Sequence, residues 1–150
     1  MRYLLSTLIA VFFFASVTYA EDGIIRIKSS HDVKTTVARL ENKLREKGMT
    51  VFMRINHAEG AQKVGKKLRP PELIIFGNPK VGTPLVQCGQ SVAIDLPQKA
   101  LIWQDENGQV WLSYNDPDYL VERHGIEGCA EVLKKVKGAL GKFAKAATMP

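Results

Sequence analysis

A hairpin in the second half of the chain is the feature that most constrains the fold. Residues 100–104 and 110–114 have the composition of strands, and the five residues between them include Asn107-Gly108. Asn and Gly tolerate the positive backbone φ that tight hairpin turns need. Earlier in the chain, Leu73 to Phe76 is a continuous apolar run, which predicts a central strand buried on both faces or nearly so. The stretch from Glu72 to Tyr119 therefore predicts the centre of a sheet.

The rest of the chain contains two long helical patterns and two more strand patterns. Alternation of apolar and polar residues predicts strands over residues 24–30 and 49–55. Apolar residues at intervals of three or four predict a helix over 33–47 and a long one over 129–147. Weaker patterns predict short helices around residues 58–68, 82–90 and 118–124.

These elements predict an α+β fold of order β-α-β-β-β-β-α. We expect an antiparallel-rich curved sheet with two long helices on one face and a cleft between helix and sheet. The last helix carries several lysines and could instead lie on a membrane surface. Its apolar stripe is what a helix lying across a sheet requires, so we favour docking on the sheet and do not expect membrane-surface contact.

The N-terminus has the pattern of a secretory signal peptide. Arg2 is followed by an apolar run from Leu4 to Val17 and by small residues before Glu21. The alternative is a membrane anchor, but the run is shorter than the roughly 20 residues of a spanning helix. We predict cleavage after Ala20, which leaves a single domain, residues 21–150, in the periplasm or secreted.

Export to an oxidising compartment changes how the two cysteines and the net charge are interpreted. Cys88 and Cys129 are the chain's two cysteines, and an even number in an oxidising compartment predicts a disulfide. A reactive thiol or a metal pair is the alternative, although the chain has no CxxC motif. The formal net charge of +6 is modest, and together with export it argues against a nucleic-acid partner.

Three strings resemble one known family. ELIIFGNPKVGTPL, IDLPQKALIW and GQVWLSYNDPDYLVERHGI resemble the bacterial and archaeal domain of unknown function numbered 302, over roughly residues 24–125. The resemblance implies a compact α+β domain similar to the TATA-binding-protein-like arrangement. It also implies a homodimer, and it implies no particular activity. The two cysteines lie outside the motif and fit an exported branch.

The polar turns at the ends of predicted strands are where we expect a site. Gly77 to Thr83 could cradle an anion through backbone amides or simply form a tight turn. The candidate ligand-binding residues are His57, Asn78, Lys80, Asp95, Tyr114, Asn115 and Asp116. His57 is the residue most expected to face the site.

The sequence leaves three functions open. We rank first a periplasmic module that binds a small anionic or amphipathic ligand. The second is a structural or interaction protein acting as a homodimer, and the third an uncharacterised enzyme whose catalytic residues the sequence does not identify. The three histidines show no metal-ligand spacing, so we expect neither a metal nor another cofactor.

Overall fold

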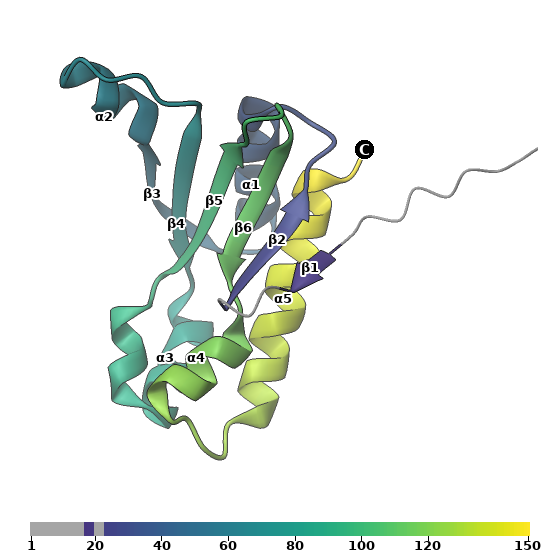
Figure 1. Cartoon of the computed structure of the whole chain (residues 1–150). Helices are drawn as coiled ribbons and strands as arrows, with labels where there is room; N and C mark the ends of the chain where they lie inside the picture. The colour runs from purple at the N-terminus through teal and green to yellow at the C-terminus, as the bar shows by residue number, and fades with distance from the viewer. Residues whose placement is uncertain (1–16, 20–22) are drawn as a thin grey trace, which may run out of the picture.

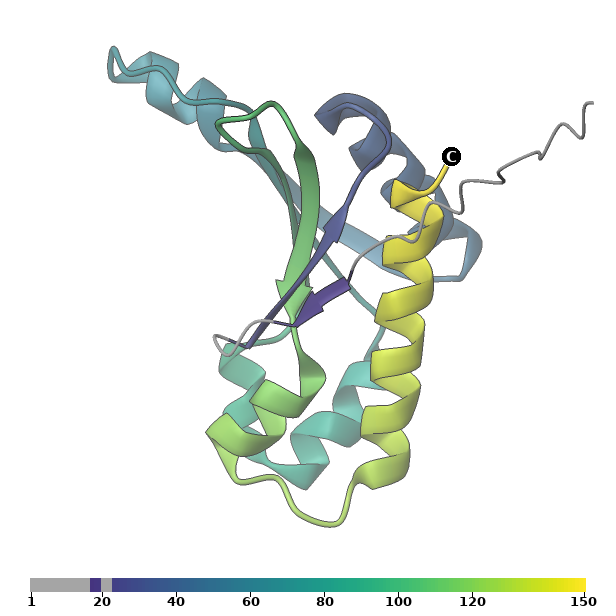
Figure 2. The same ribbon diagram turned by 45° about the vertical axis from the view of Figure 1, so that its right-hand side comes forward.

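The computed structural model describes residues 17–19 and 23–150, and it shows an antiparallel sheet with two long helices on one face (Figures 1 and 2). The strands run across the sheet in the order β1-β2-β6-β5-β4-β3, and all neighbours are antiparallel. They are β1 (Val17–Tyr19), β2 (Ile24–Lys28), β3 (Thr50–Asn56), β4 (Pro71–Gly77), β5 (Gln98–Gln104) and β6 (Val110–Asn115). The helices are α1 (Val33–Glu46), α2 (His57–Lys63), α3 (Pro79–Cys88), the 3-10 helix η1 (Gln90–Ile94), α4 (Pro117–His124) and α5 (Ala130–Thr148). The predicted α+β class is confirmed.

Strand β1 was not predicted, because it lies within the expected signal peptide. Its backbone pairs with β2 in the register Val17↔Ile27 and Tyr19↔Ile25. Ala20, with the predicted cleavage point, lies outside the described residues. Cleavage after Ala20 therefore stays a prediction.

In the described part of the chain, helices cover one face of the sheet, and the central strand β4 is less buried than predicted. Ile74 and Phe76 are buried, whereas Leu73 and Ile75 are half-buried, so β4 alternates instead of being buried on both sides. Helices α1 and α5 lie together on one side of the sheet (Figure 2). The opposite face therefore keeps its apolar side chains partly exposed.

The two long helices begin and end where the sequence chemistry indicates. Asp32 caps α1 by accepting a 2.7 Å hydrogen bond from the Thr35 amide, and Gly48 follows the helix with φ of 71°. Helix α5 buries its apolar stripe, including Val136 and Leu140, against the core. Burying a side chain of this size stabilises the fold by about 1.5–3 kcal/mol, which explains why α5 docks on the sheet.

Helix α3 begins earlier than the sequence indicated. Asn78 is its N-cap and Pro79 its first residue, so the predicted turn at Gly77 to Thr83 is partly helical. Proline suits this position because its fixed φ matches a helix and its missing N–H would be unsatisfied there. At the other end, Cys88 lies at disulfide-bonding distance from Cys129, with 6.2 Å between the Cα atoms.

Candidate functional site

A cavity of about 430 Å³ lies between helices α3 and α5 and the strand ends beside them. Helix α5 contributes Val136, Ala139, Leu140 and Phe143, and α3 contributes Val81, Leu85 and Val86 among others. Met49, Phe52, Gly77, Ala93, Leu96 and Pro97 complete most of the apolar wall. The predicted cleft lay between the two long helices and the sheet, whereas this cavity is walled by α3 and α5 and includes no residue of α1.

Two glycines of the cavity wall differ in the space in front of them. A Cβ built at Gly77 would lie 3.2 Å from Cε2 of Phe52 and 3.5 Å from Cβ of Pro97, so a larger residue here would have to displace the Phe52 ring by a few tenths of an ångström. A Cβ built at Gly82, in contrast, would meet only Cδ1 of Leu96, at 4.0 Å. The space in front of Gly82 can therefore hold a larger group.

Gln98 supplies the most informative polar group of the cavity. Its side chain lines the wall at the start of β5, and the residue is 9% exposed. Within the described part of the chain, its Nε2 atom has no hydrogen-bond acceptor. A buried amide donor without a partner costs free energy, so Gln98 is a polar group that the surrounding side chains leave unsatisfied.

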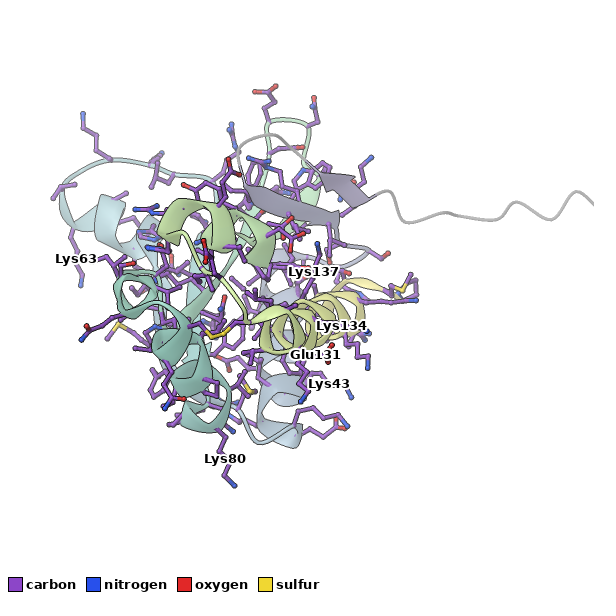
Figure 3. The ribbon with its side chains drawn as sticks, turned by 90° about the horizontal axis from the view of Figure 1, so that it is seen from below. Lys43, Lys63, Lys80, Glu131, Lys134 and Lys137 are labelled. Atoms are coloured by element: carbon purple, nitrogen blue, oxygen red, sulfur yellow. A yellow bond between two sulfur atoms is a disulfide. The ribbon has the colours of Figure 1, made fainter. Side chains whose placement is uncertain are left out.

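The predicted turn from Gly77 to Thr83 does contribute to this cavity, but not as an anion cradle. Asn78 Oδ1 accepts from the Lys80 amide at 2.9 Å, and Asn78 Nδ2 donates to the Gly48 carbonyl at 2.9 Å. Asn78 therefore starts α3 and holds it to the end of α1. The Lys80 side chain is exposed and points outward (Figure 3).

The second predicted turn lies on another side of α5. Tyr114 is buried on the helix-covered face of β6, and Asn115 follows it opposite Ile24 of β2. Asp116 caps α4 by accepting from the Asp118 amide at 3.0 Å, and it lies 3.9 Å from Lys137 of α5. These residues hold β6, α4 and α5 together and do not line the cavity.

Asp95 takes part in a separate polar cluster. Its Oδ2 atom lies 2.6 Å from Nε2 of His124, and Nδ1 of the same ring lies 3.1 Å from Ser91 Oγ. Arg123 adds a contact of 3.5 Å to Asp95. Serine, histidine and carboxylate in contact have the composition of a nucleophilic triad. The cluster lies outside the cavity and joins η1 to α4, so we assign it a structural role.

His57 does not face the cavity. It is exposed at the start of α2, which lies at the far end of the sheet from α3 (Figure 1). We expected His57 beside the other strand-end turns because it follows a strand. In an antiparallel sheet, however, the C-terminal ends of neighbouring strands lie at opposite ends of the sheet. The structure brings Asn78 to the cavity and leaves His57, Asp95 and the Tyr114 turn elsewhere.

Among residues 17–19 and 23–150, no group of three or more His, Cys, Asp or Glu side chains could hold a metal ion. Over the same residues, no helix is both long and apolar enough to cross a membrane.

The fold and the cavity define a small α+β domain with an apolar pocket between its helices. The chain belongs to the family described as "Domain of unknown function DUF302", whose model matches residues 25–143. A crystal structure of an uncharacterized conserved DUF302 protein from Bacillus stearothermophilus has the same fold, with a TM-score of 0.75. It is 21% identical in sequence, and the match covers 83% of this chain and 98% of that one.

Curated relatives are longer proteins. The chain is 41% identical over 128 residues to "Fluoride-specific ion channel FluC 1" of Brucella suis, covering 83% of this chain and 50% of that protein. The match to "Fluoride-specific ion channel FluC 2" of Brucella melitensis is also 41% identical and covers 47% of that protein. The chain thus spans about half the length of these relatives.

Proposed function

We propose that this protein binds a small apolar or amphipathic molecule in the cavity between α3 and α5. The observation that carries the proposal is the apolar cavity of about 430 Å³ itself, whose wall is formed almost entirely by apolar side chains. Sites for small molecules commonly measure roughly 300–1,000 Å³ and combine apolar walls with a few polar groups. An alkyl chain with eight buried methylenes would gain about 6 kcal/mol before the costs of association.

The expected setting supports such a ligand. A leader ending at Ala20 would place the domain outside the cytoplasm, in contact with membrane-derived molecules. The Brucella relatives, of which this chain matches about half, are named ion channels, which reside in membranes. A domain that works beside a membrane meets amphipathic molecules at high local concentration.

The test is direct binding combined with a substitution that fills the cavity. We expect the neutral dye N-phenyl-1-naphthylamine to gain fluorescence on binding the purified protein and to be displaced by decanol. Gly82→Leu should weaken the binding of the dye and the binding of decanol by at least about tenfold, because the new side chain enters the space in front of Leu96. Stability should hold or rise, since glycine inside a helix costs roughly 0.5–1 kcal/mol.

Gly60→Leu is the matched control for this substitution. Gly60 lies in α2, and a Cβ built there meets nothing within 4 Å. The control should bind the dye as the natural protein does. Absence of dye binding to the natural protein, or equal binding by Gly82→Leu, would reject the proposal.

A second candidate, a homodimer, is favoured by the uncovered face of the sheet. Met53 is 54% exposed, and Leu73, Ile75, Leu101 and Trp103 are half-buried on the face that α1 and α5 leave open. A second copy would cover these side chains from water. Sedimentation velocity tests this: Leu101→Glu should shift a dimer toward monomer, and a monomeric natural protein at all concentrations would exclude it.

A further inference from the structure

A lysine-lined groove adjoins the cavity along the outer side of helices α1 and α5. Its volume is about 650 Å³. Helix α5 contributes Lys134, Lys135 and Lys142, while Lys43 and Lys47 come from the C-terminal end of α1. Figure 3 shows Lys43 and Lys134 close to Glu131 beside α5, while Lys63 and Lys80 lie elsewhere. The groove gathers cations from two helices.

The groove has an excess of positive charge that the protein does not neutralise. Glu46 lies 2.7 Å from Lys43 and 3.5 Å from Lys47, and the hydrogen bond from Lys43 lowers the pKa of Glu46. Five lysines against Glu46 and Glu131 leave a formal charge of +3. In the part of the chain that the structure describes, the three lysines of α5 form no ion pair with a carboxylate. A bound anion would relieve their mutual repulsion.

The groove and the cavity meet on one helix. Ala139 and Phe143 line both, and Met49 of the cavity lies two residues beyond Lys47 of the groove. An apolar compartment bordered by cations is complementary to a molecule with an apolar chain and an anionic head. A purely apolar ligand would make no use of the lysines, and a small inorganic anion would make no use of the cavity.

From this juxtaposition we infer that the ligand is a single-chain anionic amphiphile. Its alkyl chain occupies the apolar cavity, and its carboxylate or phosphate group lies among the lysines of α1 and α5. This inference rests on the proposed binding function and names the chemical class of the ligand.

The experiment compares ligands that share a chain and differ in charge. Displacement of N-phenyl-1-naphthylamine is measured below the micellar concentration with decanoate, decyl phosphate, decanol and decyltrimethylammonium. Lys134→Gln/Lys142→Gln removes two cations from the groove. Lys63→Gln/Lys145→Gln is the matched control, because it removes the same charge from exposed positions outside the groove.

We expect decanoate and decyl phosphate to bind the natural protein more tightly than decanol does. The groove variant should weaken the binding of the two anions about two- to thirtyfold, the range for two exposed charge pairs, and leave the binding of decanol unchanged. The difference should shrink at high salt. The Lys63→Gln/Lys145→Gln control should retain the natural preference.

Other outcomes overturn the inference in distinguishable ways. Equal binding of decanol and decanoate, unaffected by the groove variant, would reject the anionic class and leave the cavity function standing. Failure of every ligand and of the dye would reject the proposed function as well. Sedimentation with anionic phospholipid vesicles, lost in the groove variant and without displacement by decanoate, would make the groove a membrane-docking surface instead.

Discussion

Removal of the cysteine pair should lower stability more than any other change of two residues outside the core. Cys88 is the last residue of α3 and Cys129 the N-cap of α5, so the pair ties together the two helices that enclose the cavity. The cysteines are 41 residues apart, and closing a loop of that length stabilises a fold by roughly 4 kcal/mol in the loop-entropy model. That is a large part of the 5–15 kcal/mol typical of a domain.

The assay is urea unfolding of the double variant Cys88→Ser/Cys129→Ser, followed by tryptophan fluorescence. We expect a loss of about 4 kcal/mol, a fall in Tm of roughly 10–20 °C and weaker dye binding, because the cavity walls are no longer joined. Natural protein treated with a reductant is the control and should behave like the variant. A loss below about 1 kcal/mol, or two thiols open to alkylation in the unreduced natural protein, would refute the reasoning.

Two further predictions concern the polar turns. Asn78→Ala should lower the free energy of unfolding by about 2 kcal/mol, roughly half from loss of the helix cap and half from loss of the hydrogen bond to Gly48. Asn78→Asp keeps the cap, so it should lose less stability in thermal unfolding. Equal losses of stability in the two variants would contradict this division. The hydrogen bond from the Trp111 indole lowers the pKa of Asp105 below its unfolded value of about 3.9. The resulting stability is present above about pH 4 and is lost as the pH falls through the lower folded-state pKa. Asp105→Asn should therefore lower Tm at pH 7, and the difference in Tm from the natural protein should shrink as the solution is acidified below pH 4.

The fold was largely predictable because its signals are local. The hairpin around Asn107-Gly108, the alternation over Ile24–Lys28 and the apolar stripe of α5 are each contained in one stretch of sequence. One error has a physical cause. The apolar run from Leu73 to Phe76 predicts a strand buried on both faces, but the helices lie on one face of the sheet, so alternate side chains of the strand face water.

The cavity was not predictable to the same extent because it is made by distant segments. The Gly77 to Thr83 turn was expected to matter, and it lines the wall, but its partners in α5 are more than 50 residues away. Gln98 carried no signal, since a glutamine becomes informative only when its burial and missing acceptor are known. The contact of His124 with Asp95 was missed for the same reason, because no spacing in the sequence indicates it.

Helix α5 docks on the sheet, which is one of the two arrangements that its sequence pattern allowed. Its lysines and apolar stripe fit either a helix docked on a sheet or a helix lying on a membrane. Val136 and Leu140 are 3% and 5% exposed, so the stripe is already buried and cannot enter a bilayer without unfolding the core. Its lysine face nevertheless stays in solvent beside Ala139, at the border of the cavity. Under the proposed function, these lysines would attract the anionic head of the ligand while the apolar side chains of α5 remain in the core.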